Sequence, residues 1–458
     1  MKTTLILDEQ SVLAHDGVSF HLNPATKHPE NPVMLPGEPH QWDSLQVSWP
    51  ATVLYSAEEK KFRCWYSGFD VIQTPDRFWK PGYAESEDGI HWTKPNLGQV
   101  EFLGSGTNRI EVDWPYTVLS TVFENPEPDA PESKRFASYW TELGEDKAYR
   151  KGLAYSPDGM RWTRARTAYE GLPNNRASFQ DISQVIYDVD ESDPDYRIKA
   201  YSQLVWKRPY DGRPDVRHIG LACGRDIETL RDAEQPLMLA PEEGIDEELH
   251  FAAVKRAGGQ FVMLFESDRF AKNPIHGDLK LAVSEDGKKP FRRVHPNDAV
   301  VPTGVKGFWD ENLLVTTTSA IQEVGDELYI YYIGCPNTYN SWPPPYMVSP
   351  ERRGSMFAPA YLGLATLKRD RYACAQGPGS VTVSIGGDSG DLWLNADGDD
   401  ITVTALGPSG NALAEGRVSD ERSCTVYRRV LWSKPSAGAS VRVSLGDGCR
   451  LYSIGTKE

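Results

Sequence analysis

Acidic residues that stand close to an aromatic residue or a histidine recur at wide intervals along the chain. In chain order these groups are Trp42-Asp43, Asp113, Asp181, Glu247-Glu248 with His250, and Trp309-Asp310. Paired carboxylates can break a glycosidic bond, because one protonates the leaving oxygen and the other attacks the anomeric carbon or activates water. Crowded carboxylates raise the pKa of one of their number, which keeps that acid protonated near neutral pH. The pattern therefore favours acid–base chemistry on a neutral substrate such as a sugar.

Residues beside these acids are candidates for holding the substrate. The substrate-binding candidates are Trp42, Asp113, Arg176, Glu247, His250, Trp309 and Asp310. The tryptophans suit the apolar faces of a sugar ring, and the polar members suit its hydroxyl groups; the alternative for each is a role in packing or strand register. A ring of acids can also bind a cation through oxygen ligands, so the pattern accommodates a structural Ca²⁺ in an axial channel, while requiring no cofactor.

A repeated unit must bring these distant residues together. One short pattern occurs five times, as Gly82–Ser86, Gly152–Ser156, Gly220–Gly224, Lys280–Ser284 and Gly363–Leu367. An alternating aromatic strand precedes each copy, at Phe62–Tyr66, Phe136–Trp140, Tyr196–Tyr201, Phe261–Phe265 and Leu328–Tyr332. Another apolar strand precedes each aromatic strand, and Asp-Gly turns follow three of the copies. Period-two alternation indicates strands, and Asp-Gly favours tight turns.

Each unit is thus expected to be a meander of about four strands, and repeats of this length indicate stacking around an axis. We predict an all-β protein with a five-bladed β-propeller over residues 41–370. Short strands between turn residues predict a small C-terminal β-sandwich over 371–458. Residues 1–40 are rich in proline and are expected to be a lead-in that packs on the propeller. The first strands of the blades converge on one mouth of the channel, where the acids would meet.

Composition excludes several classes of partner. The chain has 458 residues and a formal net charge of −16, which argues against nucleic acid or an anionic membrane as a partner. No apolar run approaches the roughly 18 residues that a membrane helix needs. The N-terminal apolar patch is too short for a secretory signal, and the six cysteines are scattered, so we expect a cytoplasmic protein with reduced thiols.

Three segments of the sequence resemble those of a known family. The stretch from Tyr83 to Gly98, the segment Tyr361–Leu367 and the segment Leu392–Asp397 are typical of five-bladed glycoside hydrolases of the fructosidase and arabinanase type. These are families 32, 43 and 68 and their uncharacterised bacterial relatives. The resemblance covers nearly the whole chain in architecture, and implies a carbohydrate substrate.

The resemblance also implies roles for three acids in chain order. Asp43 would be the nucleophile or base, Asp181 would stabilise the transition state, and Glu248 would be the general acid, with Glu247 as its alternative because alternation turns one of the two inward. The fructosidase pattern Asn-Asp-Pro-Asn-Gly is replaced by Gln41–Leu45 here. A furanoside such as a fructoside or arabinoside is favoured, while other glycosides remain open.

Two other functions are compatible with the same pattern. A glycoside phosphorylase would need cationic residues beside the acid, for which Arg109, Arg176 and Arg269 are candidates. A non-catalytic carbohydrate-binding propeller would bind sugars without turnover.

Overall fold

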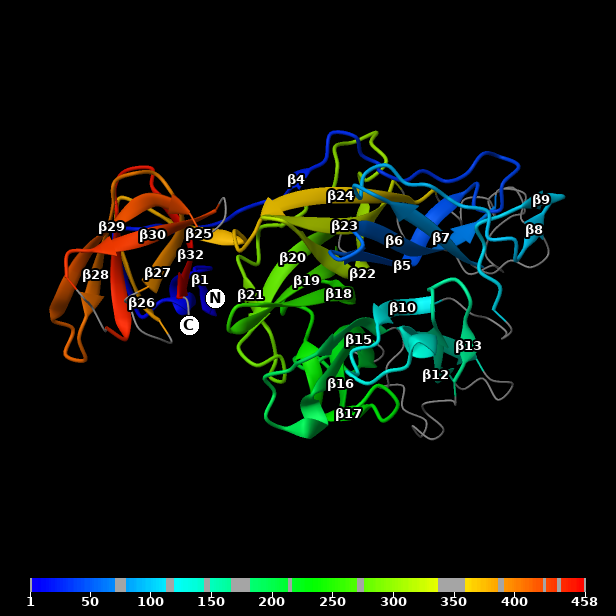
Figure 1. Cartoon of the computed structure of the whole chain (residues 1–458), viewed down its shortest axis with the longest axis horizontal. Helices are drawn as coiled ribbons and strands as arrows, with labels where there is room; N and C mark the ends of the chain where they lie inside the picture. The colour runs from blue at the N-terminus through cyan, green and yellow to red at the C-terminus, as the bar shows by residue number, and fades with distance from the viewer. Residues whose placement is uncertain are drawn as a thin grey trace.

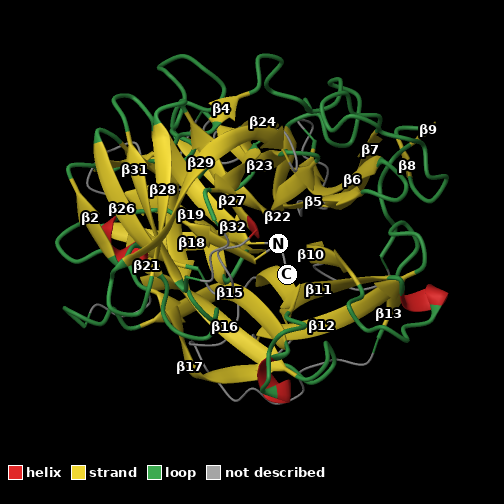
Figure 2. Cartoon of the chain, turned by 60° about the vertical axis from the view of Figure 1, so that its left-hand side comes forward, coloured by secondary structure: helices red, strands yellow, loops and turns green. Residues whose placement is uncertain are grey.

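The computed structural model describes residues 2–70, 80–112, 119–143, 149–165, 182–212, 216–269, 276–336, 359–385, 391–422, 426–434 and 438–456. Strands dominate this part of the chain, as Figure 2 shows. Its helices are the short 3-10 turns η1 (Glu9–Ser11), η2 (Glu132–Lys134) and η3 (Pro194–Tyr196). No helix in these ranges is both long and apolar enough to cross a membrane.

Most of the chain forms successive antiparallel meanders, which we number in chain order. The first contains β5 (Gln46–Ser56), β6 (Lys61–Phe69) and β7 (Lys80–Ser86). The second contains β10 (Leu119–Glu124), β11 (Phe136–Leu143), β12 (Tyr149–Ser156) and β13 (Thr163–Arg164). The third contains β14 (Ile182–Tyr187), β15 (Ile198–Trp206), β16 (Val216–Gly224) and β17 (Arg231–Leu239).

The fourth contains β18 (Glu247–Ala257), β19 (Gln260–Arg269), β20 (His276–Ser284) and β21 (Arg292–Val294). The fifth contains β22 (Leu313–Val324), β23 (Glu327–Cys335), β24 (Tyr361–Lys368) and the distant β4 (Thr26–Lys27). A two-stranded sheet of β8 (Glu101–Phe102) and β9 (Ser105–Gly106) follows the first meander.

The fourth, fifth and first meanders join in one curled 11-stranded sheet, whereas the second and third are separate four-stranded sheets (Figure 1). Single parallel pairings join the fourth meander to the fifth, at Gly277 and Leu313, and the fifth to the first, at Thr318 and Thr52. The first strand of every meander contributes to one pocket of about 440 Å³, through Leu54, Phe123, Val185, Val254 and Ile321 among others. These five strands therefore face a common space.

The predicted Asp-Gly turns have a clear structural role. In each, one aspartate oxygen accepts the backbone N–H groups of the two residues that follow the glycine, as Asp88 does for Ile90 and His91 at 2.8 Å. Gly89, which lies between Asp88 and Ile90, has a φ of 78°, a left-handed conformation that favours glycine. The turns are thus structural.

The C-terminal strands form a second large sheet with the start of the chain (Figure 1). Its strands are β25 (Ala373–Gln376), β26 (Gly379–Ser384), β27 (Leu392–Asp397), β28 (Ile401–Leu406), β29 (Ala412–Arg422), β30 (Tyr427–Trp432), β31 (Ser440–Leu445), β32 (Arg450–Thr456), β1 (Lys2–Leu5), β2 (Ala14–Asp16) and β3 (Ser19–Leu22).

The N-terminal segment contacts both parts of the molecule. Strands β1, β2 and β3 pair with β32, β26 and β25, whereas β4 pairs with β24 of the fifth meander. Leu5 and Leu7 pack in one apolar cluster with Leu264 and Leu279 of the fourth meander. The segment therefore links the two parts; the domain boundaries expected at residues 40 and 370 stay predictions.

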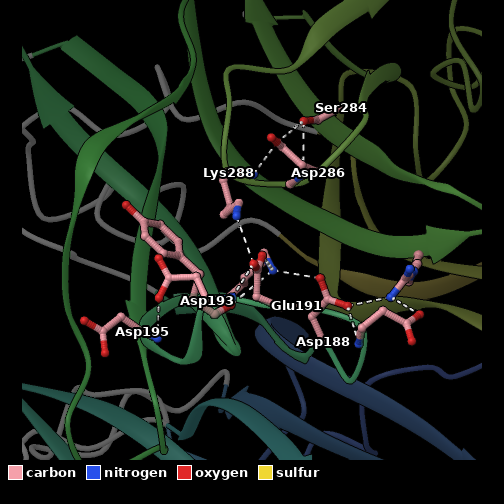
Figure 3. Close-up of polar contacts among 12 residues, drawn as sticks. Asp188, Glu191, Asp193, Asp195, Ser284, Asp286 and Lys288 are labelled. Atoms are coloured by element: carbon pink, nitrogen blue, oxygen red, sulfur yellow. Dashed lines mark hydrogen bonds and ion pairs between the residues drawn. The ribbon is translucent and has the colours of Figure 1, made fainter.

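A buried ion network fixes the loop that joins β14 to β15 (Figure 3). The ammonium group of Lys199 is fully buried and lies 2.8 Å from Asp188 Oδ2 and 3.1 Å from Glu191 Oε2. Lys288, from the fourth meander, reaches Glu191 Oε1 at 2.9 Å. These contacts cross-link adjacent meanders at the end of the first strands remote from Glu247 and Glu248.

Candidate functional site

Trp42 and Asp43 are both buried beside the first meander, with 4% and 2% of their surface exposed. The hydroxyl of Tyr66 donates to Asp43 Oδ2 at 2.7 Å, and the ammonium of Lys94 lies 2.5 Å from the same oxygen. The Trp42 ring stacks on the Tyr66 ring at a centroid distance of 5.8 Å. Burial, and then the Asp43 charge, raises the pKa of Tyr66 well above its usual range, so the hydroxyl remains a donor.

Trp309 and Asp310 repeat this arrangement in the fifth meander. The hydroxyl of Tyr332 donates to Asp310 Oδ2 at 3.3 Å, and Lys27 lies 2.5 Å from the same oxygen. Trp309 stacks on Tyr332 at 5.7 Å.

One glycine makes room for each of these two tryptophans. A Cβ at Gly68 would lie 2.2 Å from the Trp42 ring, and a Cβ at Gly334 would lie 2.2 Å from the Trp309 ring. The same arrangement occurs twice, each time around a buried carboxylate that is paired with a lysine. This favours a shared structural role for Asp43 and Asp310. The catalytic role expected for Asp43, and the sugar-platform role expected for the tryptophans, therefore stay predictions that this packing does not support.

Glu247 and Glu248, the first residues of β18, have different surroundings. Glu247 is fully buried, lies 2.7 Å from Arg293 Nη2 and accepts a hydrogen bond from Ser267. Glu248 Oε2 lies 2.6 Å from Arg217 Nη1, and its side chain is 11% exposed against 41% for the arginine. Of these two glutamates, only Glu248 is reached by a partner that is itself open to solvent.

Three buried titratable residues lie next to Glu248. Asp268 on β19 faces Glu248 in the strand register, Glu266 stands two residues earlier on the same face, and His250 lies in the bulge of β18. His250 Nδ1 is 3.5 Å from Asp268 Oδ2 and 3.8 Å from Glu266 Oε1. In the described residues, this is the one group of three or more with the geometry to hold a metal ion.

The electrostatics of this cluster are unusual. Burial works to lower the pKa of His250, but the carboxylates of Asp268 and Glu266 outweigh it and raise that pKa to about 9. Burial, and then the charge of Asp268, raises the pKa of Glu266 well above its ordinary value. Two buried carboxylates with one histidine need further positive charge, either a proton or a bound cation.

An aromatic stack connects the cluster with the first meander. Trp49 of β5 stacks on Phe251 of β18 at 4.0 Å, and Phe251 stacks on His250 at 4.8 Å. This stack fixes one face of the His250 imidazole and leaves its edge toward the two carboxylates.

Glu266 and Asp268 were not predicted from the sequence, although the repeat carries a signal for them. The strand register aligns Asp268 with Gly68 and Gly334, and Glu266 with Tyr66 and Tyr332. It aligns Glu248 with the apolar Val47 and Leu314. The fourth meander thus carries charged residues at three positions where the first and fifth carry glycine, tyrosine and an aliphatic residue.

Other expected site residues are not brought into this cluster. Asp113, Arg176 and Asp181 lie outside the described residues, so their expected roles stay predictions. The Arg109 guanidinium lies 5.9 Å from the Trp42 ring centroid, away from the cluster. Arg269 pairs with Glu247 in the strand register, next to the cluster.

Comparison with solved structures identifies proteins of similar fold. An N-acetylgalactosamine deacetylase from F. plautii, in complex with blood group B trisaccharide, superposes with a TM-score of 0.50 and 17% identity, covering 76% of this chain and 95% of that chain. A thermostable family-43 glycoside hydrolase gives 0.47 and 14%, covering 75% and 96%. A fructofuranosidase variant from Schwanniomyces occidentalis, complexed with fructosylnystose, gives 0.45 and 9%, covering 92% and 98%.

The likeness is one of fold. Structural neighbours of the chain include glycoside hydrolases of propeller type, in agreement with the resemblance noted in the sequence, as well as a deacetylase and a phosphorylase. No protein-family model matches the sequence, and no curated protein is similar to it in sequence.

Proposed function

We propose that the chain is a glycoside hydrolase that acts on a short oligosaccharide, with its site at the start of β18. The observation that carries this proposal is the break in the repeat at Glu248, Glu266 and Asp268. Buried charged groups lower the stability of a fold, and the first and fifth meanders have none at these positions. Their presence in the fourth meander therefore favours a chemical role there.

Glu248 is the proposed contact with the substrate, because its side chain is more exposed than those of Glu247, Glu266 and Asp268. Its Oε2 atom lies 2.6 Å from Arg217 Nη1, so a cation stands beside the carboxylate proposed to attack the anomeric carbon or stabilise an oxocarbenium-like transition state. The resemblance implies the general-acid role for the same residue. Asp181 remains the residue proposed to stabilise the transition state, from the resemblance alone.

A five-bladed propeller with a C-terminal β-sandwich is the proposed architecture. It is supported by the five meanders, by their shared pocket and by the separate apolar core of the C-terminal strands. Carbohydrate is the proposed ligand class, and one structural neighbour has a trisaccharide bound. A furanoside is the favoured substrate, and the proposed location is the cytoplasm.

A product assay tests this function. The wild-type protein would be incubated with fructosides, arabinosides, galactosides and mannosides, with and without phosphate, and with N-acetylated sugars while acetate is measured. We expect phosphate-independent sugar release that Glu248→Gln lowers by about 100-fold or more. Glu243→Gln, an exposed glutamate in the preceding loop, is the matched control and should retain turnover.

Other outcomes would contradict the proposal in distinct ways. Sugar phosphate that forms only with phosphate would indicate a phosphorylase, and acetate release without glycoside cleavage would indicate a deacetylase. Saturable sugar binding without any product would indicate a binding protein. Full turnover by Glu248→Gln would remove the site from the start of β18.

A further inference from the structure

We propose that His250, Glu266 and Asp268 bind one divalent transition-metal ion, of which Zn²⁺ is the probe. The site lies on β18 and β19, and the proposal concerns binding of the ion, so it stands independently of the proposed hydrolase activity.

The distances within the cluster suit ligands of one ion better than hydrogen bonds. An N–H···O hydrogen bond spans up to about 3.2 Å, whereas His250 Nδ1 lies 3.5 and 3.8 Å from the two carboxylates. Nitrogen and oxygen ligands stand about 2.1 Å from Zn²⁺, so two of them at a tetrahedral angle are roughly 3.4 Å apart. One ligand atom from each residue lies within 4.8 Å of the others.

The carboxylate of Glu266 provides an independent observation. Its surface is 0% exposed, and neither of its oxygens has a hydrogen-bond partner among the described residues. Buried carboxylates in proteins are normally hydrogen-bonded, paired or bound to a metal. The side chain is directed at His250, so a ligand placed there would satisfy it.

The cluster also keeps space beside Asp268. This residue is 1% exposed, and its Oδ1 atom has no hydrogen-bond partner in the described residues. A Cβ at Gly277 would lie 2.5 Å from that oxygen, so any larger residue would close the space.

The donor set indicates the class of metal. One imidazole nitrogen and two carboxylates match the three protein ligands of open zinc sites, which leave a fourth position for water or another ligand. Ca²⁺ and Mg²⁺ prefer sites built wholly of oxygen. We therefore expect Zn²⁺ or Mn²⁺ to bind more tightly than either.

Strand geometry holds the ligands before any ion binds. Glu266 and Asp268 are two apart on β19 and so share a face, while the bulge of β18 and the stack on Phe251 orient His250. A prepared set of ligands of this kind lowers the entropic cost of binding.

The test is titration calorimetry of the full chain after removal of metals with a chelator. Wild-type protein should bind one Zn²⁺ per chain, and Glu266→Gln and Asp268→Asn should each weaken binding by about 10-fold or more. His91→Gln is the matched control, since His91 also lies between two carboxylates, Asp88 and Glu30, but at the exposed surface. Its affinity should equal that of the wild type.

A second measurement covers variants that fail to fold. Zn²⁺ should raise the melting temperature of the metal-free wild type, because a ligand that binds only the folded state stabilises it. Anomalous scattering from zinc-soaked crystals should place the ion beside His250 Nδ1. Absence of binding by the wild type, or binding that both ligand variants retain in full, would overturn the proposal; a proton would then supply the missing charge.

Discussion

Asp43 and Asp310 have the same partners in two different meanders: on each, one oxygen accepts a tyrosine hydroxyl and contacts a lysine ammonium. The equivalence extends to the preceding tryptophan and to the glycine beneath it. Sequence position alone suggests a catalytic Asp43, whereas comparison of the two sites indicates a contact that fastens the chain to each meander.

This equivalence predicts equal effects of two substitutions. Asp43→Asn and Asp310→Asn should each lower the free energy of unfolding by about 2 kcal/mol, because each loses charge-assisted hydrogen bonds. Denaturant unfolding would measure both values. Turnover per folded molecule should stay within about threefold of the wild type for both variants. A loss of about 100-fold confined to Asp43→Asn would restore the nucleophile assignment.

A second prediction concerns the space beneath Trp42. Gly68→Ala would place a Cβ 2.2 Å from the Trp42 ring, so the ring or the strand must shift. We expect a loss of about 1–3 kcal/mol in the free energy of unfolding. Gly259→Ala is the control, because a Cβ at Gly259 meets nothing within 4 Å. Equal stability of the two variants would contradict the packing described for Trp42.

The ion pair between Glu247 and Arg293 predicts that one substitution compensates for the stability lost through another. Arg293→Met should destabilise the protein by about 3–5 kcal/mol, because it leaves the fully buried Glu247 without its guanidinium partner. Adding Glu247→Gln should recover most of that loss, since the uncompensated charge is then removed. Unfolding of both single variants and the double variant gives the coupling energy. If the double variant lost the sum of the unfolding free energies lost by the two single variants, the two residues would not interact, which would contradict the prediction.

The pKa of Glu191 predicts acid sensitivity. Burial works to raise this pKa, but the Asp193 backbone N–H, Lys288 and Lys199 lower it to about 2, from an ordinary 4.5. Since the folded-state pKa is depressed, the unfolded chain binds more protons below about pH 4.5. Glu191 should therefore contribute about 3 kcal/mol above that pH, and lose it as the pH falls toward 2.

Urea unfolding of the wild type and of Glu191→Gln, between pH 7 and pH 3, would measure this dependence. The variant should be less stable at pH 7 and should lose less stability on acidification. Glu58→Gln, at an exposed position, should follow the wild-type curve. Parallel curves for Glu191→Gln and the wild type would contradict the prediction.

Local patterns in the sequence predict the strands well, because alternation of aromatic residues is a local property. The strands expected at Phe62–Tyr66 and Phe136–Trp140 lie within β6 and β11. Pairing between distant segments has no such local signal, so the union of β1, β2 and β3 with the C-terminal sheet was not predicted.

The candidate site was predicted only in part, for a related reason. Glu248 and His250 stand out beside other acids, but the strand expected at Phe261–Phe265 stops one residue before Glu266. In the structure, β19 continues to Arg269 because β18 supplies partners as far back as Glu247. Charged residues look like the end of a strand, and only the cross-strand register identifies them as part of the buried cluster.

The pairing of β1 with β32 also bears on how the chain is made. Residues 2–5 leave the ribosome long before their partners, residues 453–456. During that time β1, β2 and β3 have unpaired edges, which are prone to join other strands. The meanders can form as they emerge, whereas the pairing of β1 with β32 must wait until β32 has been made, so the meanders can be complete before β1 reaches its native partner.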